Sequence, residues 1–241
     1  MTKQRIDSLM VVRGLVASRA KAQALIMAGE VVVVGKEIIK PGTLVSEEAV
    51  INILEPPPFV SRGGIKLVHA LDQFQIDVSA KVAADIGAST GGFTDCLLQH
   101  GAKRVYAIDV GYGQLDYRLR RDSRVVVMER VNARYPISLP EKVDLATMDL
   151  AFISVKKVIP SIAELLKEDG YLLVLIKPQF EAKKSEVGRG GVIKEPEVHA
   201  VVLGRFITWV VEHNFRLKGL VESPIRGSSG NREFFVLLKL T

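Results

Sequence analysis

Short apolar runs recur along most of this chain, and longer stretches of mixed polar and apolar residues separate them. Apolar runs bounded by glycine and charged residues predict strands, and the amphipathic stretches between them predict helices. Strands that alternate with helices indicate an α/β fold, a parallel sheet covered on both faces. We expect its strands at residues 81–86, 104–109, 125–127, 143–148, 171–176 and 234–238.

The first 55 residues follow a different pattern. Residues 5–13 and 19–28 are amphipathic and each run stops at a glycine, which predicts two helices. Short apolar segments predict strands at residues 31–34, 38–39 and 50–53. Three consecutive prolines then predict a stiff joint, because proline fixes φ and cannot continue a ladder. The pattern predicts a small α+β domain over 1–55, a linker over 56–60 and a larger domain over 61–241.

The most informative segment of the larger domain is residues 82–94, VAADIGASTGGFT. An apolar run ends in Asp85, and Gly87, Gly91 and Gly92 then lead into a predicted helix. Glycine lets the backbone turn sharply and approach a ligand, while the free N–H groups that open the helix face the same space. Open α/β sheets hold nucleotide-like ligands at such turns, beyond the carboxyl ends of their strands.

The spacing here is Gly-x-x-x-Gly-Gly, which differs from the dinucleotide-binding pattern. A carboxylate at Asp85 would repel a pyrophosphate and attract a cationic amino-acid group, and Asp109 after the next strand could accept a ribose diol. A cofactor with an adenosine and a charged amino acid meets both conditions, which indicates S-adenosylmethionine. Further candidate contacts are Ser89, Thr90, Phe93, Thr94, Asn132 near the adenine and Asp149 near the methyl group. For Ser89 and Thr94, helix capping is an equal alternative.

Composition narrows the class of protein. The net charge of +6 and the pI near 9.4 favour a polyanionic partner such as nucleic acid. A single cysteine forms no internal disulfide, and the longest apolar runs are far below the roughly 20 residues of a membrane span. The four histidines lack metal-ligand spacing, so no metal is expected. We expect a cytoplasmic protein without a membrane partner.

Residues 5–53, with the phrase ALIMAGEV from residue 24, resemble the small RNA-binding domain of ribosomal-protein-S-four type. The resemblance implies that basic side chains on the helices and the first hairpin contact the phosphates of folded RNA. The candidates are Arg5, Arg13, Arg19, Lys21 and Lys36. The alternative is that these side chains only cover a solvated surface.

Four charged residues of the larger domain form a second constellation. Asp149 and Lys177 follow predicted strands, Lys66 lies just past the joint, and Glu233 opens the last strand. Their order and the phrase IKPQFE resemble the Lys-Asp-Lys-Glu tetrad of FtsJ-like ribose 2′-O-methyltransferases, whose sheet is Rossmann-like. The whole chain resembles the TlyA family, which implies methylation of a cytidine ribose in ribosomal RNA or ribosomal subunits.

The resemblance also implies roles for the tetrad. A ribose hydroxyl must lose its proton as it attacks a methyl carbon, and Lys177 is the candidate that takes or steers that proton. Asp149 would orient Lys177, and Glu233 would fix Lys66 or the hydroxyl. The competing interpretations are a ribosome-assembly factor without methyl transfer, a haemolysin and a base methyltransferase. The sequence leaves the oligomeric state and the modified nucleotide open.

Overall fold

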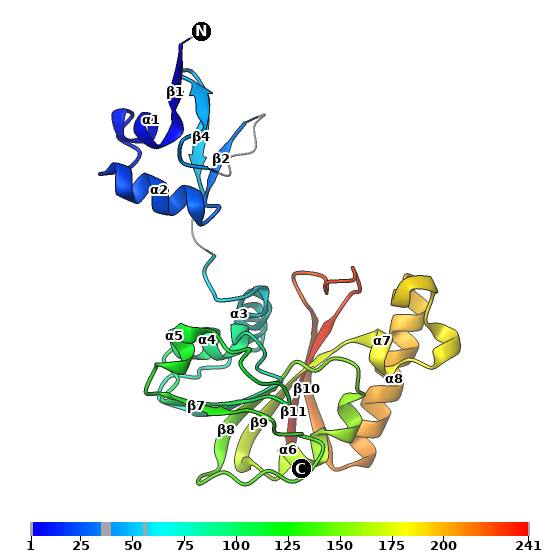
Figure 1. Ribbon diagram of the computed structural model, residues 1–241. Coiled ribbons are helices and arrows are strands. Elements are labelled where there is room, and N and C mark those ends of the chain that lie inside the picture. The colour runs from blue at the N-terminus through cyan, green and yellow to red at the C-terminus, as the bar shows by residue number, and fades with distance from the viewer. Residues whose placement is uncertain (1, 35–39, 55–56, 241) are drawn as a thin grey trace. The chain divides into compact units, whose positions relative to one another are not determined.

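The computed structural model describes residues 2–34, 40–54 and 57–240 (Figure 1). The chain divides into two compact units, residues 1–57 and 58–241. Each unit has its own hydrophobic core: one cluster lies in the first unit, and two lie on the faces of the sheet in the second. We describe the units separately.

The first unit combines two helices with two small antiparallel sheets. Helix α1 spans Ile6–Val12 and α2 spans Arg19–Met27, where the Ser18 side chain accepts a hydrogen bond from the Lys21 N–H and caps the helix. Strand β1 (Lys3–Arg5) pairs with β3 (Leu44–Ser46), and β2 (Val31–Val33) pairs with β4 (Ile51–Ile53). Both predicted helices and the first and last predicted strands are present. Strands β1 and β3 were not predicted, because neither coincides with an apolar run. The predicted strand at 38–39 lies outside the described residues.

The second unit is built on a seven-stranded sheet with the strand order β10-β11-β9-β8-β5-β6-β7. Its strands are β5 (Val82–Ile86), β6 (Arg104–Ile108), β7 (Val125–Met128), β8 (Val143–Met148), β9 (Leu166–Ile176), β10 (Phe215–Glu222) and β11 (Phe234–Leu240). Neighbours from β7 to β9 pair in parallel, while β11 pairs antiparallel with both β9 and β10. The predicted α/β fold with a parallel sheet is confirmed for the neighbours from β7 to β9, and the sheet departs from it at β11, which is reversed.

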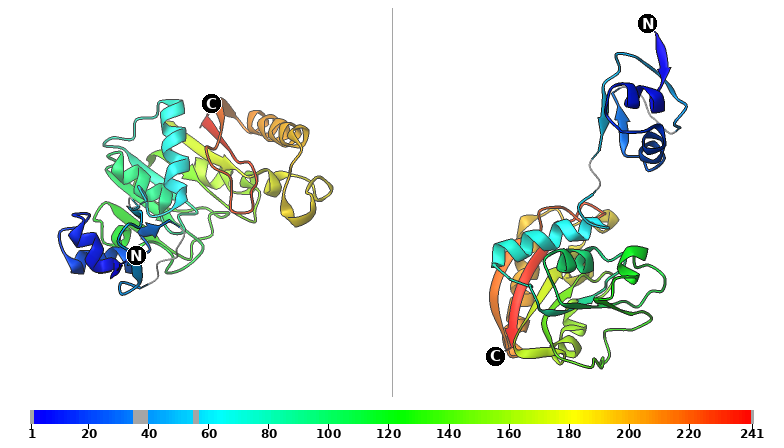
Figure 2. Two further views of the ribbon diagram at one scale, coloured as in Figure 1. Left: turned by 90° about the horizontal axis from the view of Figure 1, so that it is seen from above. Right: turned by 90° about the vertical axis from the view of Figure 1, so that its left-hand side faces the viewer.

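Helices cover both faces of this sheet. Helices α3 (Arg62–Phe74), α4 (Gly92–Gln99) and α5 (Tyr117–Arg120) pack on one face through residues such as Leu67 and Leu97. Helices α6 (Ile159–Ala163) and α8 (Pro196–Glu212) pack on the other through Ile162 and Phe206. Figure 2 shows the cyan α3 and the orange α8 on opposite sides of the strands. The remaining short helices are α7 (Pro178–Glu181), η1 (Val155–Lys157), η2 (Lys184–Glu186) and η3 (Arg189–Gly191).

The reversal of β11 decides where its first residues lie. Phe234, at the start of β11, pairs with Ile176, at the end of β9. The beginning of β11 therefore lies at the edge of the sheet where the parallel strands end. Glu233 reaches the same edge as Asp149 and Lys177 for this reason, although it precedes its strand and they follow theirs.

Candidate active site

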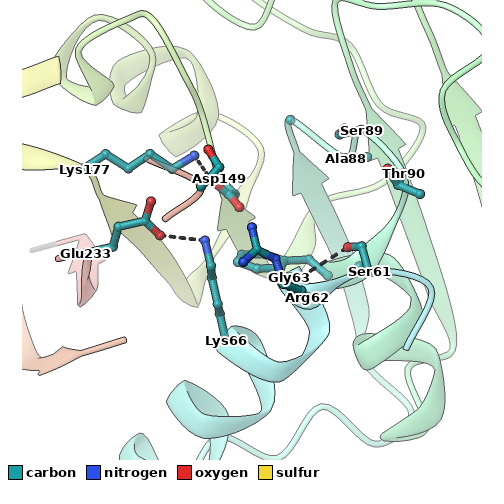
Figure 3. Close-up of a pocket in the computed structure, with 14 residues that line it drawn as sticks. Ser61, Arg62, Gly63, Lys66, Ala88, Ser89, Thr90, Asp149, Lys177 and Glu233 are labelled. Atoms are coloured by element: carbon teal, nitrogen blue, oxygen red, sulfur yellow. Dashed lines mark hydrogen bonds and ion pairs between the residues drawn. The ribbon is translucent and has the colours of Figure 1, made fainter. Parts of the chain in front are cut away.

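The four charged residues of the predicted tetrad meet in one cavity of about 360 Å³ (Figure 3). The Nζ atom of Lys177 lies 2.6 Å from Oδ1 of Asp149, and Nζ of Lys66 lies 2.6 Å from Oε2 of Glu233. The Lys66 and Glu233 side chains are 11% and 3% exposed, so their ion pair is largely removed from water. The cavity thus contains two lysine–carboxylate pairs contributed by four separate segments.

Helix α3 brings Lys66 to this cavity. Ser61 caps the helix by accepting a hydrogen bond from the Gly63 N–H at 3.3 Å, and Lys66 points toward Glu233 from the following turn. The start of α3 packs so closely on the start of α4 that a Cβ atom on Gly92 would lie 2.2 Å from Ser61 Oγ. A glycine at this position is what allows the two helix N-termini to converge on the cavity.

The glycine turn after β5 forms the opposite wall. Gly87 has a φ of 82°, and a Cβ atom there would lie 2.5 Å from the Asp149 carbonyl oxygen. Gly91 has a φ of 97° and precedes α4. The turn therefore requires glycine for its backbone conformation and, at Gly87, for the close approach of Asp149. Of the predicted cofactor contacts, the cavity is lined by Gly87, Ser89, Thr90, Gly92, Phe93 and Asp149.

Asp85 is buried behind this turn. It does not line the cavity. It is 1% exposed and accepts hydrogen bonds from the Thr94 N–H at 2.9 Å and the Thr94 hydroxyl at 2.7 Å. Burial raises the pKa of Asp85 to about 7, although the hydrogen bonds from Thr94 oppose this shift. In this position Asp85 holds the first turn of α4 against β5.

A second cavity, of about 510 Å³, adjoins the first and shares Gly87, Ser89 and Asp149 with it. It is also lined by Asp109 and Asn132, the residues expected near a ribose and an adenine. Backbone N–H groups orient the Asp109 carboxylate: Oδ2 accepts from Ser89 at 2.8 Å and Oδ1 from Gly111 at 2.6 Å. Each of these oxygens has capacity for a further donor. We call these two adjoining cavities the trough; because they share lining residues, one elongated ligand could occupy both.

Several residues that line the two cavities were not predicted from the sequence. Arg62 and Ser228 line the tetrad cavity, and Phe152 lines the neighbouring one. Phe152 is 92% exposed and has a φ of 64°, while its ring centroid lies 5.3 Å from that of Phe180. Its place three residues after Asp149 is the only feature of the sequence that could have drawn attention to it.

In the first unit, the predicted RNA contacts also make internal contacts. Asp7 is fully buried, and its carboxylate pairs with Arg5 at 2.8 Å and Arg19 at 2.9 Å. These pairs hold the pKa of Asp7 well below its usual range. The Arg13 guanidinium donates to the carbonyl oxygens of Ala49 and Glu47. Lys21 is exposed, and Lys36 lies outside the described residues.

The described part of the chain offers neither a metal-binding cluster nor a membrane-spanning helix. Within residues 2–34, 40–54 and 57–240, no three His, Cys, Asp or Glu side chains are grouped so that they could hold a metal ion. Over the same residues, every helix is too short or too polar to cross a membrane.

Two family descriptions match this chain. The FtsJ-like methyltransferase family matches residues 59–240, which is more than half of the sequence, and the S4 domain matches residues 4–51. The first match covers both cavities, and the second covers the unit that contains Arg5, Arg13, Arg19 and Lys21.

Individual relatives cover nearly all of the sequence. The 16S/23S rRNA (cytidine-2'-O)-methyltransferase TlyA of Mycobacterium tuberculosis is 43% identical, over 98% of this chain and 90% of the relative. Hemolysin A of Brachyspira hyodysenteriae is 40% identical, over 95% of this chain and 97% of the relative. A solved structure from Streptococcus thermophilus, described as a candidate hemolysin, has a TM-score of 0.76 at 42% identity and covers 100% of this chain and 90% of that chain.

Proposed function

This chain belongs to the TlyA family of FtsJ-like methyltransferases with an S4 domain, and from that membership we propose that it methylates ribosomal RNA. The acceptor is the ribose 2′-hydroxyl of cytidine, and the donor is S-adenosylmethionine. One observation supports this proposal above the others: the Lys177–Asp149 and Lys66–Glu233 pairs share a cavity with the glycine turn. We place the reaction in the cytoplasm, where ribosomal subunits would be the partners.

The residues that line the trough support S-adenosylmethionine as the cofactor. Asp109, with both oxygens oriented by backbone N–H groups, would accept the two hydroxyls of the adenosine ribose, and Asn132 lies in the same cavity. Ser89 and Asp149 line both cavities, so the methionine part would extend past them toward the tetrad. S-adenosylmethionine supplies an electrophilic methyl group from its sulfonium. Asp85 contributes indirectly, by fixing α4 and the turn.

The tetrad then handles the acceptor. As the new oxygen–methyl bond forms and the sulfur–methyl bond breaks, the 2′-hydroxyl must release its proton. Lys177 steers this proton as the ammonium paired with Asp149, or takes it as the neutral amine, and the contact with Asp149 keeps Nζ directed into the cavity. Glu233 fixes Lys66, whose ammonium holds the acceptor oxygen in line with the methyl group. Alignment of two reactants contributes roughly 7–11 kcal/mol in favourable cases, so this positioning is a large part of catalysis.

The S4 unit provides the RNA contact on its own surface. The Arg5 and Arg19 side chains remain about half exposed although both pair with Asp7, and Lys21, two positions after Arg19, is exposed. Asp7 fixes the direction of both guanidiniums, which suits them to bind phosphates in a defined register. On the methyltransferase unit, the exposed ring of Phe152 offers a stacking surface for an unpaired base of the substrate.

The test is transfer of a labelled methyl group from S-adenosylmethionine to purified ribosomal subunits. We expect the native protein to yield 2′-O-methylcytidine after digestion to nucleosides, and we expect Lys177→Ala to yield none. Lys218→Ala, at an exposed position of β10, is the matched control and keeps native activity. A label found on a base would identify a base methyltransferase. No transfer to either subunit by native protein that binds the cofactor would favour an assembly factor.

A further inference from the structure

Glu181, the last residue of α7, joins two loops that leave the sheet at the active-site edge. Its Oε2 atom accepts a hydrogen bond from the Ser154 hydroxyl at 2.6 Å, and its Oε1 atom accepts one from the Val155 N–H at 2.7 Å. Ser154 and Val155 begin the short helix η1, in the loop that follows β8. A single carboxylate therefore ties the loop after β8 to the helix after β9.

The same two loops contain half of the tetrad. Asp149 follows β8 and lies five positions before Ser154, and Lys177 follows β9 and lies four positions before Glu181. The strands pair in parallel, and the Lys177–Asp149 ion pair joins their ends at 2.6 Å. The two loops are thus connected twice, once by the ion pair inside the cavity and once by Glu181 further along. Glu181 itself is not one of the described residues that line the tetrad cavity.

Backbone hydrogen bonds hold the first residues of each loop. The Phe180 N–H donates to the Lys177 carbonyl oxygen at 2.9 Å, so Glu181 moves together with Lys177. The Asp149 N–H donates to the Ile86 carbonyl oxygen at 3.0 Å, which anchors the start of the other loop on β5. A shift of Glu181 away from Ser154 would consequently separate the segments that hold the Lys177 amine and the Asp149 carboxylate.

The partial burial of Glu181 disfavours the ionised form of its carboxyl group. Burial raises the pKa of this carboxyl, and the hydrogen bonds from Ser154 and Val155 work against that shift. A partly buried carboxylate costs desolvation free energy, which these two hydrogen bonds offset. Its hydrogen-bond partners belong to the loop that leads away from Asp149.

We propose that Glu181 is a positioning residue for methyl transfer, which keeps the Lys177–Asp149 pair in place while the RNA acceptor enters the cavity. This inference rests on the proposed function. Glu181 acts through the loops and touches neither the acceptor nor the cofactor. Its removal should therefore lower the rate of the chemical step without a matching loss of cofactor binding.

Three variants of the full-length protein test the inference. Glu181→Ala removes both hydrogen bonds, and Ser154→Ala removes one of them. Glu181→Gln retains both, because its amide oxygen accepts from Val155 and its amide N–H group can donate to the Ser154 hydroxyl. The control is Glu186→Ala, which breaks the pair with Arg205 between η2 and α8 and the hydrogen bond from the Lys183 N–H, and leaves the hydrogen bonds of Glu181 to Ser154 and Val155 in place.

We expect Glu181→Ala to lower kcat about 10- to 100-fold, the range typical of groups that hold a catalytic side chain in position. Glu181→Gln should stay within about threefold of native, and the dissociation constant of S-adenosylmethionine should change less than about twofold in each variant, since none of them touches the trough. Ser154→Ala should fall between the native protein and Glu181→Ala. A folded Glu181→Ala with native kcat, or a Gln variant as slow as the Ala variant, would overturn the inference.

A second readout separates this inference from the proposed function. In a crystal structure of Glu181→Ala, the Lys177–Asp149 distance should exceed the roughly 4 Å limit of an ion pair. If Glu181→Ala does not fold, Ser154→Ala answers the same question, and an unchanged pair at 2.6 Å together with native kcat refutes the inference. If native protein methylates no RNA, the proposed function fails, while this distance still decides whether Glu181 holds the pair.

Discussion

The Nζ atom of Lys66 lies 2.6 Å from Oε2 of Glu233, although the two residues are 167 positions apart in the chain. Both are buried; Lys66 lies on α3, and Glu233 directly precedes the reversed strand β11. The pair therefore links the first helix of the methyltransferase unit to its last strand.

Breaking this pair from one side should cost more stability than replacing both partners. Lys66→Ala leaves the Glu233 carboxylate buried without its cation, and we expect a loss of about 3–5 kcal/mol in the free energy of unfolding. The double variant Lys66→Met with Glu233→Leu removes both charges and should recover much of that loss while remaining inactive. Urea denaturation and methyl transfer to ribosomal subunits measure the two effects. Native activity in the double variant would exclude the pair from catalysis.

Gly87→Ala should destabilise the protein and abolish methyl transfer. The new Cβ would lie 2.5 Å from the Asp149 carbonyl oxygen, and the φ of 82° is itself unfavourable by about 1–2 kcal/mol for an L-residue. We expect a total loss of at least about 2 kcal/mol, because backbone cannot move aside as a flexible side chain can.

Gly204→Ala is the matched control for this substitution. Gly204 lies on the exposed side of α8, where a Cβ would meet no atom within 4 Å. Alanine in a helix interior should raise the free energy of unfolding by about 0.5–1 kcal/mol and leave activity unchanged. Equal effects of the two substitutions in thermal denaturation would show that Gly87 has no special steric role.

Phe152→Ala should weaken the use of RNA without weakening the fold. The ring is 92% exposed, so its removal costs little packing, whereas stacking on a base contributes about 1–3 kcal/mol. We expect kcat/KM for ribosomal subunits to fall about tenfold or more, with unchanged melting temperature and unchanged cofactor affinity. Tyr117→Ala, at an exposed aromatic position on α5, serves as the comparison. A native kcat/KM for Phe152→Ala would show that the exposed ring does not contact the substrate.

The pH dependence of stability should report on Asp85. Its pKa is raised in the folded protein to about 7, so the folded state binds a proton more tightly than the unfolded state does. The associated stability is complete at pH values below the unfolded pKa of about 4, and it is lost as the pH rises through about 7. Asp85→Asn cannot titrate and still accepts the hydrogen bonds from Thr94.

Denaturation of both proteins between pH 4 and 8 tests this expectation. The free energy of unfolding of the native protein should decline relative to that of Asp85→Asn by at most about 1.4 kcal/mol per pH unit, the limit for one proton. The decline should level off above pH 7. Two parallel curves over this range would show that the pKa of Asp85 is not raised in the folded protein.

The sequence was informative where local chemistry is distinctive, and less so where long-range pairing decides the structure. The glycine turn and the residues at strand ends could be placed, because buried apolar strands and glycine requirements are local properties. The reversal of β11 and the small strands β1 and β3 depend on which distant segment each one pairs with. The first part of β9 was not predicted, because residues 167–169 are polar and resemble a turn. The strand nevertheless begins at Leu166, which pairs with Val143 of β8.

Asp85 illustrates a different limit. Asp85 lies two positions after Ala83 in β5, so the two side chains point to the same face of the sheet. Ala83 packs on the face that α3 and α4 cover. Strand alternation therefore predicts that the carboxylate lies beneath α4. Its charge indicated a role in ligand binding, but the face of the strand on which it lies determines what it can touch. The two hydrogen bonds from Thr94 follow from this position.

The S4 unit allows a prediction that separates RNA contact from folding. Arg19 both projects toward solvent and pairs with the buried Asp7, whereas Lys21 is exposed in the same first turn of α2. If both bind phosphates, each Ala substitution should lower the salt dependence of RNA binding by somewhat less than one unit of log K per log salt. Only Arg19→Ala should also destabilise the unit, because it deprives a buried carboxylate of one of its cations. Filter binding at several salt concentrations, together with denaturation, measures both. An Arg19→Ala variant with lower stability and a native salt slope would show that Arg19 serves Asp7 alone, and the RNA contact would then lie elsewhere on the unit.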